Sequence, residues 1–301
     1  MNHFSSNFLK GIGIGSANVI PGVSGGTIAL LTGIFERLIN SLKSFNLTAL
    51  QLLFKGKFKE LGKFIDFWFL LSVGLGIIVS IFTIAKLFEV WLAGYHSRIY
   101  LMCFFLGLII ASIYFVGKTV RKWDWKTVLA LIIGASIAIT IFILNYKKGI
   151  SVENQATTSE MNTNFLYIML CGVVGICSMI LPGLSGSYVL LLMGVYDNII
   201  GAVSNLEWAV LIPFAIGAVV GLLAFSHVLS WVFKKFPDIT IALLTGFIFG
   251  SLPVIYPWYN TVTNEMVLPN ADIKLVIAIV LAILGASVIV LTEKLAEKKS
   301  K

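Results

Sequence analysis

Two apolar stretches of this chain are each interrupted by the same five-residue pattern, Pro-Gly-x-Ser-Gly, at residues 21–25 and 182–186. Proline removes a backbone hydrogen-bond donor, and glycine and serine tolerate non-helical backbone, so neither stretch is predicted to form one straight helix. We expect residues 8–42 and 165–204 each to form two short half-helices around a kink. Because such half-helices are too short to cross a bilayer comfortably, we interpret each stretch as a re-entrant hairpin that enters and leaves on one side.

The rest of the chain is dominated by long apolar runs. Hydrophobic residues make up 58% of the sequence and charged residues 12%, whereas soluble domains have about half apolar and about a quarter charged residues. Six uninterrupted runs are long enough to cross a hydrocarbon core of about 30 Å as helices, and they are not the short alternating segments of a barrel. They cover residues 64–90, 99–117, 127–145, 208–233, 239–256 and 273–292. The sequence therefore predicts an all-α polytopic membrane protein.

The distribution of basic residues predicts the orientation of the chain. If the two hairpins do not cross, most of the 22 lysines and arginines lie in the loops and termini of one side. Since lysine and arginine accumulate on the cytoplasmic side, we expect both termini to be cytoplasmic. Two extra crossings would preserve this sidedness, so the charges leave open whether the hairpins are re-entrant or fully spanning. Residues 43–63 and the extracytoplasmic linker 147–164 are predicted to be ordinary loops.

The two interrupted stretches are copies of one another. The segment that begins at Ala17 aligns without gaps with the segment that begins at Ser178, and weaker similarities follow in the later spans. Residues 1–146 and 165–301 are therefore predicted to be two repeats, each a hairpin followed by three transmembrane helices. Three crossings are an odd number, so the second repeat is inverted relative to the first. Inverted repeats with broken helices near the midplane are typical of secondary transporters.

The tips of the two hairpins carry polar groups that suit an anion. Backbone amides at the start of each second half-helix, around Gly25 and Gly186, are predicted to lack helical partners. Hydroxyl groups accompany them; these belong to Ser24, Thr27, Ser185, Ser187 and Tyr188. The alternative interpretation is structural: the Pro-Gly-x-Ser-Gly pattern lets two hairpins pack closely while the hydroxyls bond to backbone carbonyls. The presence of two copies at matching places favours a role in substrate binding or passage.

A few ionisable or amide side chains near the hairpins are further candidates. Glu36 and Arg37 end the first hairpin and Asp197 ends the second, so Arg37 is a candidate phosphate ligand and the two acids are candidates for handling ions or protons. Simple solvation at the interface is the alternative. His227 lies inside a predicted span, where a packing role competes with a proton relay. Asn18 is either a link between helices or a substrate ligand.

The sequence shows no pattern for other classes of site. Cys103, Cys171 and Cys177 lie in apolar runs without ligand-like spacing, so we interpret them as small buried residues. There is no Gly-x-x-x-x-Gly-Lys loop and no cluster of histidine and cysteine. We therefore expect no cofactor, no metal and no nucleic-acid partner; the oligomeric state is not predicted.

With both hairpins considered, the chain resembles a known family. Asn-Val-Ile-Pro-Gly-Val-Ser-Gly-Gly-Thr from Asn18, with Phe-Glu-Arg from Phe35, is similar to one signature of the bacterial polyprenyl-phosphate transporter family. Pro-Gly-Leu-Ser-Gly-Ser from Pro182, with Tyr-Asp from Tyr196, is similar to the second signature. The resemblance extends over essentially the whole chain. It implies a protein of the bacterial cytoplasmic membrane that returns undecaprenyl phosphate from the outer to the cytoplasmic leaflet for envelope polymer synthesis.

The resemblance also transfers candidate residues to this sequence. The positions that match the family's motifs are Asn18, Pro21, Gly22, Ser24, Gly25, Gly26, Thr27, Glu36, Arg37, Pro182, Gly183, Ser185, Gly186, Ser187 and Asp197. Pro21, Gly22, Pro182 and Gly183 are interpreted as shaping the hairpins, and the others as binding substrate or handling ions. The second hairpin departs from the first at Met179, Ser187 and Asn198, so whatever Asn18, Gly26 and Arg37 do is done in one half only.

Two other functions remain as alternatives. An ion-coupled carrier for a small soluble anion would share the inverted repeat and the polar tips. An intramembrane serine protease would use Ser185 as nucleophile and His227 as base, but the same glycine and serine pattern at residues 22–25 has no histidine in the corresponding span. We therefore expect a transporter of a lipid phosphate and no enzyme activity.

Overall fold

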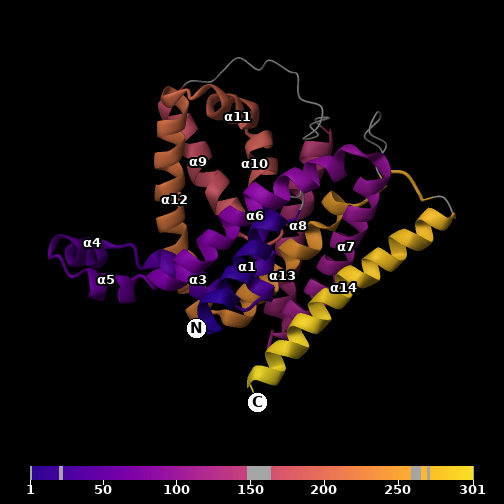
Figure 1. The fold of residues 1–301 in the computed structure, drawn as a ribbon, viewed down its shortest axis with the longest axis horizontal. Helices are drawn as coiled ribbons and strands as arrows, with labels where there is room; N and C mark the ends of the chain where they lie inside the picture. Colours follow the sequence, from indigo (N-terminus) through magenta and orange to yellow (C-terminus); the bar gives the residue numbers. More distant parts are fainter. Residues whose placement is uncertain (1, 20–22, 148–163, 259–265, 270–271, 301) are drawn as a thin grey trace.

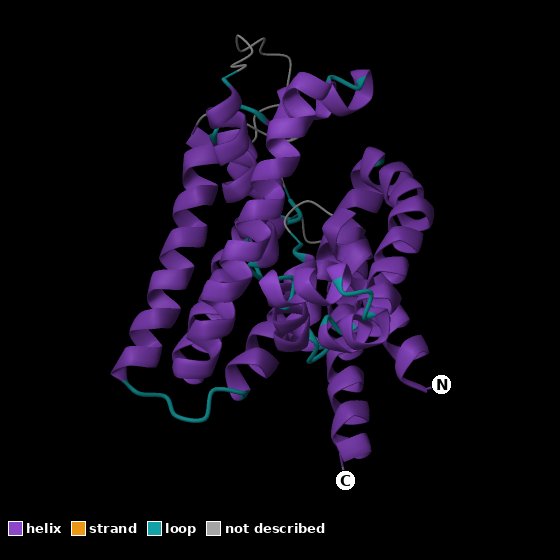
Figure 2. Cartoon of the chain, turned by 90° about the vertical axis from the view of Figure 1, so that its left-hand side faces the viewer, coloured by secondary structure: helices purple, strands orange, loops and turns teal. Residues whose placement is uncertain are grey.

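The computed structural model describes residues 2–19, 23–147, 164–258, 266–269 and 272–300, which are largely helical (Figures 1 and 2). The first half contains α1 (Asn2–Val19), α2 (Gly25–Leu31), α3 (Phe35–Lys43), α4 (Leu47–Phe54), α5 (Phe58–Phe64), α6 (Phe67–Ala93), α7 (Tyr95–Lys118) and α8 (Trp125–Lys147). The second half contains α9 (Phe165–Ile180), α10 (Gly186–Leu192), α11 (Tyr196–Asn205), α12 (Trp208–Lys235), α13 (Pro237–Gly250), the 3₁₀ helix η1 (Leu252–Ile255) and α14 (Ile273–Ser300).

The helices confirm a multi-pass membrane protein. Five are long and apolar enough to cross a bilayer, or up to seven candidates if bent helix pairs in the described residues are included. The five are Ser97–Lys118, Trp125–Tyr146, Trp208–Lys235, Pro237–Ile255 and Ile273–Leu291. The sixth predicted span corresponds to α6, which is bent by 66° against α5. Each predicted span thus coincides with a helix to within a few residues, except that α14 continues as far as Ser300.

The loop before α8 shows how one of these spans begins. The Asp124 carboxylate accepts a hydrogen bond from the Thr127 backbone N–H at 2.8 Å, and the Thr127 hydroxyl accepts one from the Asp124 N–H at 2.9 Å. This reciprocal pair satisfies donors at the helix start. The Thr127 N–H also holds the pKa of the Asp124 carboxyl below its usual value.

Each interrupted stretch contains three helices where the sequence predicted two. After the first break, α2 and α10 run for seven residues, and then the chain turns again at Gly33 and Gly194. Both glycines have positive φ, 68° and 71°, which is the usual way to end a helix. In the second stretch, α10 and α11 meet at 114°. The second half-helix of each stretch is therefore interrupted by a turn at a glycine.

Residues 43–63 differ from the predicted ordinary loop. They contain α4 and α5, which form an arm that extends sideways from the helix bundle (Figure 1). The Asn46 side chain begins α4 by accepting hydrogen bonds from the N–H groups of Thr48 and Ala49. The prediction of an ordinary loop was wrong because the lysines between the two helices interrupt the apolar pattern. Each helix alone is too short to show a clear helical periodicity. Of the predicted linker 147–164, residues 148–163 lie outside the described part of the chain.

Close helix crossings hold the bundle together through glycines. Helix α1 packs along α6, and α9 packs along α12. A Cβ at Gly76 would lie 2.2 Å from the Phe8 carbonyl oxygen, and a Cβ at Gly217 would lie 1.9 Å from the Met169 carbonyl oxygen. The backbones therefore touch at the same relative place in both pairs.

Two further pairs cross in the same way. Helix α7 packs on α14, and α8 packs on α13. A Cβ at Gly107 would lie 1.8 Å from the Ala282 oxygen, and a Cβ at Gly246 would lie 2.1 Å from the Leu131 oxygen. Small residues at such crossings let the backbones of transmembrane helices approach closely. This packing matters in a bilayer because the hydrophobic effect contributes little to the association of helices that are surrounded by lipid.

Candidate functional site

The two tips contact each other directly. The Ser24 hydroxyl donates to the Leu181 carbonyl oxygen at 3.3 Å, and the Gly183 N–H donates to the Thr27 hydroxyl at 3.1 Å. A Cβ at Gly26 would lie 2.6 Å from the Ile180 carbonyl oxygen, so the two backbones are in direct contact. Ser24 and Thr27 are buried. The structure thus joins two segments that are more than 150 residues apart in the chain.

The polar groups of the first tip already have partners within the protein. The Gly25 N–H donates to the Asn18 side-chain oxygen at 2.8 Å, and the Gly26 N–H donates to the Ser24 hydroxyl at 3.2 Å. The Thr27 N–H donates to the Ser24 carbonyl oxygen at 3.0 Å. Asn18 therefore links α1 to α2 in this conformation, and the first tip presents satisfied groups to the second.

The second tip is arranged differently. Ser185 precedes α10 without making a capping hydrogen bond, and its hydroxyl lies 2.7 Å from the Ser187 hydroxyl. Ser185 lines a small cavity together with Tyr188 and with Ser251 after α13. The cavity has a volume of about 20 Å³, enough for about one water molecule. It is polar on one wall and too small for a phosphate group in this conformation.

A buried amide lies beside the second tip. The Asn145 side-chain nitrogen donates to the carbonyl oxygens of Ile141 and Tyr188, at 3.0 and 3.2 Å, and so ties α8 to α10. Its side-chain oxygen has no hydrogen-bond partner although the residue is only 1% exposed. An unsatisfied acceptor in such a place is costly, which identifies the α8–α10 contact as a polar element inside the bundle.

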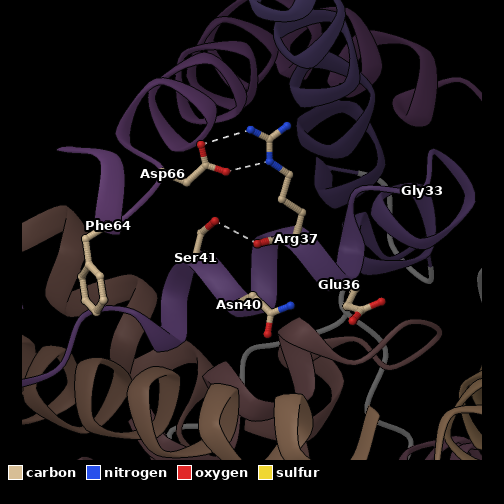
Figure 3. A pocket seen from close by; sticks show the side chains of 7 residues that line it. All are labelled: Gly33, Glu36, Arg37, Asn40, Ser41, Phe64 and Asp66. Carbon is tan, nitrogen blue, oxygen red and sulfur yellow. Dashed lines mark hydrogen bonds and ion pairs between the residues drawn. The ribbon is translucent and has the colours of Figure 1, made fainter. Parts of the chain in front are cut away.

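A larger pocket lies beside the first hairpin (Figure 3). It has a volume of about 500 Å³ and is lined by Gly33, Glu36, Arg37, Asn40, Ser41, Phe64 and Asp66. Arg37 donates to both carboxylate oxygens of Asp66, from Nε at 2.6 Å and from Nη2 at 3.0 Å. The guanidinium also lies 4.2 Å from the centre of the Phe69 ring. The pocket therefore contains a fixed cation that a carboxylate neutralises.

Accessibility decides how strongly that ion pair is held. The Arg37 side chain is 49% exposed and the Asp66 side chain 35% exposed. Ion pairs with this exposure contribute about 0–1 kcal/mol to stability, and bidentate geometry places this one toward the upper end. A phosphate group can bind a guanidinium through two oxygens in the same way as this carboxylate does.

Helix α3 attaches this pocket to α12, in the second half of the chain. The Asn40 side-chain oxygen accepts a hydrogen bond from the Ser230 hydroxyl of α12 at 2.8 Å. The Phe35 and Phe233 rings, both buried, lie 5.9 Å apart. The wall that carries Arg37 is therefore packed on α12 and not on its own half alone.

The remaining predicted residues are more dispersed. Glu36 lines the Arg37 pocket, whereas Asp197 is exposed in the first turn of α11. The His227 Nδ1 atom lies 2.8 Å from the Leu223 carbonyl oxygen of its own helix, so the ring is held against α12. Pro182 is buried behind the second tip. Pro21 and Gly22 lie outside the described residues. No group of three metal-ligating side chains occurs in the described part of the chain.

Sequence reasoning missed part of each pocket. Asp66 lies within the predicted span 64–90 and was not singled out, because its pairing with Arg37 depends on a fold that brings together residues 29 positions apart. Asn40 and Phe64 were not singled out. The one sequence signal was that Asp66 is an acid at the edge of an apolar run, beside the most basic loop of the chain.

The chain is similar to proteins of one known family. A family model described as VCA0040-like, undecaprenyl phosphate translocase-like, matches residues 14–271. The chain is 37% identical over 263 residues to a polyprenyl-phosphate transporter of Vibrio cholerae, covering 87% of this chain and 80% of that protein. It is 30% identical over 262 residues to a polyprenyl-phosphate transporter of Staphylococcus aureus, covering 85% and 87%. No solved structure matches it.

Proposed function

The chain belongs to the undecaprenyl phosphate translocase-like family, and from this premise we propose that it carries a polyprenyl phosphate across the bilayer. The proposed direction is from the outer to the cytoplasmic leaflet of the bacterial cytoplasmic membrane, where the lipid is reused in envelope polymer synthesis. The observation that carries the proposal is the direct contact between two polar tips, with an arginine pocket beside the first tip and a small cavity at the second that Ser185, Tyr188 and Ser251 help to line.

The proposed architecture is a pair of inverted repeats, residues 1–146 and 165–301. The hydrogen bonds at the second turn of each hairpin support it. Ile34 N–H bonds to the Ala29 oxygen, as Val195 N–H bonds to the Leu190 oxygen, and Gly33 and Gly194 repeat the match with Leu30 and Leu191. The glycine crossings of α1 with α6 and of α9 with α12 also correspond.

The later helices support the same symmetry. Gly107 of α7 and Gly246 of α13 occupy corresponding places, and each contacts a helix of the opposite repeat. Helices α1 and α6 pack within the first repeat and α9 and α12 within the second, whereas α7 packs on α14 and α8 on α13 between the repeats. A two-fold axis in the membrane plane would produce such matching pairs. We place both termini in the cytoplasm, on the basis of the lysine and arginine distribution.

The physical problem for a lipid phosphate is its head group, since the tail never needs to leave the lipid. An isolated charge in hydrocarbon costs tens of kcal/mol in a Born estimate. The two hydrogen bonds that hold the tips together contribute only about 0.5–1.5 kcal/mol each. Breaking these two hydrogen bonds is therefore far cheaper than moving the phosphate through lipid.

In the proposed mechanism the tips part as one repeat rocks against the other. Ser185, Ser187 and Tyr188 hold the phosphate as the small cavity widens. Ser24 and Thr27 lose their bonds to the second tip and become donors and acceptors for the passing head group. Arg37 then receives the phosphate while Asp66 gives up its two hydrogen bonds. Return of Asp66 to Arg37 releases the product.

Transport by reconstituted protein tests this function. In proteoliposomes with labelled undecaprenyl phosphate in one leaflet, the protein is expected to move the label to the other leaflet. The double variant Ser24→Ala plus Ser185→Ala is expected to lower the rate at least about tenfold, the equivalent of roughly two neutral hydrogen bonds. Ser287→Ala is the matched control, because that hydroxyl bonds only within exposed α14. A double variant that moves the lipid at the wild-type rate would remove the tips from the mechanism.

The same vesicles separate the second candidate, an ion-coupled carrier for a small soluble anion. The arginine pocket of about 500 Å³ is large enough for a free anion, which is the reason to retain this candidate. Uptake of labelled inorganic phosphate without movement of the lipid would favour the carrier. The protease alternative gains no support, since Ser185 bonds to Ser187 and His227 to Leu223 in the described structure.

A further inference from the structure

The arm formed by α4 and α5 has almost no core of its own. Its helices are eight and seven residues long, and Ala49 is the one residue of α4 that is buried, while no residue of α5 is. Helices this short are not stable in water by themselves. The arm therefore requires a surface that covers its apolar side chains.

The apolar side chains of the arm are unusually exposed. Phe54 is 85% exposed, Leu47 76% and Phe58 67%, and Leu50 and Leu53 on α4 are exposed as well. Lys59 and Lys63 lie on the other side of α5 from Phe58, Leu61 and Phe64, as their helical spacing requires. Each helix thus has an apolar face beside a polar one.

The charge of the arm identifies the surface it fits. Lys55, Lys57, Lys59 and Lys63 are all exposed, and the single acid Glu60 is paired with Lys57 at 2.9 Å. Two copies of such an arm would repel each other, which disfavours a second copy of the chain as the partner. Exposed leucine and phenylalanine beside a row of lysines is the composition of helices that lie in the interface of an anionic membrane.

The position of the arm agrees with this surface. Helix α3, which leads into it, packs on the end of α12 that carries Trp231, Lys234 and Lys235. Aromatic and basic residues at the end of a span mark the membrane–water interface. After the arm, the chain bends by 66° to enter α6, beginning with exposed Phe67 and Trp68. The arm therefore leaves the bundle where the bilayer surface lies.

We propose that the α4–α5 arm docks in the interface of the leaflet at this end of the bundle and binds anionic phospholipid head groups through its lysines. Its apolar face would lie among the upper acyl chains, with Phe54 deepest. Because Phe64 at the end of the arm lines the Arg37 pocket, docking also fixes one wall of that pocket. The proposal does not depend on which substrate is transported.

Spin labels on the full chain test the docking. In a background with Cys103, Cys171 and Cys177 replaced by alanine, one label is placed at Phe54→Cys and a matched one at Lys59→Cys on the polar face. Bilayer nanodiscs contain either phosphatidylcholine alone or its equal mixture with phosphatidylglycerol. With phosphatidylglycerol, the label at 54 is expected to be accessible to oxygen and protected from a water-soluble nickel chelate. The label at 59 is expected to show the reverse.

Charge removal distinguishes anionic recognition from general immersion. Replacing Lys55, Lys57, Lys59 and Lys63 with glutamine is expected to lower the ratio of docked to undocked arm in the mixed bilayer, by roughly fivefold per lysine. High salt is expected to act in the same direction. A label at 54 that remains open to nickel in both bilayers would overturn the proposal. Spin–spin coupling between labels at 54 on different molecules would also overturn it, because a second copy would then cover the arm.

Discussion

Replacing Gly183 with alanine is expected to abolish transport and to destabilise the protein strongly. Gly183 has a φ of 78°, which costs other residues about 1–2 kcal/mol. A Cβ at this position would also lie 2.4 Å from the Phe247 carbonyl carbon and 2.5 Å from the Ile248 nitrogen. These are backbone atoms of α13 and cannot rotate away, so the second tip must move and lose its contact with Thr27. Thermal unfolding in detergent and transport in proteoliposomes measure the two effects.

Gly194→Ala is the matched control for this substitution. Its φ of 71° is nearly the same, but no atom lies within 4 Å of the added Cβ. It is therefore expected to cost about 1–2 kcal/mol of stability, the conformational part alone, and to retain transport. If Gly183→Ala were no worse than Gly194→Ala, the close packing of the second tip on α13 would not matter for function.

The second large effect is expected at Arg37. Arg37→Gln removes the cation of the larger pocket and is expected to lower transport by about tenfold to a hundredfold, since hydrogen bonds to charged groups contribute about 1.5–3 kcal/mol. Arg37→Lys is expected to be intermediate because an ammonium group keeps the charge but not the bidentate geometry. Initial rates over a range of lipid concentrations measure the loss.

Arg121→Gln is the matched control for charge. It removes one cation from the exposed loop between α7 and α8, away from the residues that line the pocket. Its transport rate is expected to stay at the wild-type level. Equal losses in Arg37→Gln and Arg121→Gln would reduce the role of Arg37 to a contribution to net charge.

The transmembrane helices could be predicted from sequence because the bilayer imposes a simple rule. A long apolar run must form a helix there to satisfy its backbone, and all six predicted runs do so. The second turn of each interrupted stretch, at Gly33 and Gly194, was not predicted. The Pro-Gly pattern nearby is a stronger signal for a break, so only one break per stretch was expected. The arm was not predicted because its helices, of eight and seven residues, are too short to show a clear helical periodicity in the sequence.

The site was predictable only in its components. The polar residues of both tips follow from the repeated pattern, but their partners do not, because the Leu181 oxygen and the Gly183 N–H are backbone groups that carry no sequence signal. Asn18 has two sequence interpretations, and in this conformation it bonds to Gly25. The pairing of Arg37 with Asp66 requires the bend between α5 and α6, where Asp66 adopts a φ of 55°. Long-range contacts of this kind arise from the fold and not from local spacing.

The central claim is that the two tips must separate for the lipid head group to pass, and a reversible cross-link tests it most directly. Cysteines at Ser24 and Leu181, in the background without Cys103, Cys171 and Cys177, put one thiol on each of the two residues that the hydrogen bond between the tips joins. Oxidation is expected to stop lipid transport in proteoliposomes, and reduction of the same sample to restore it, while each single cysteine shows no response to oxidation. Transport that continues at an unchanged rate in fully cross-linked protein would contradict the account.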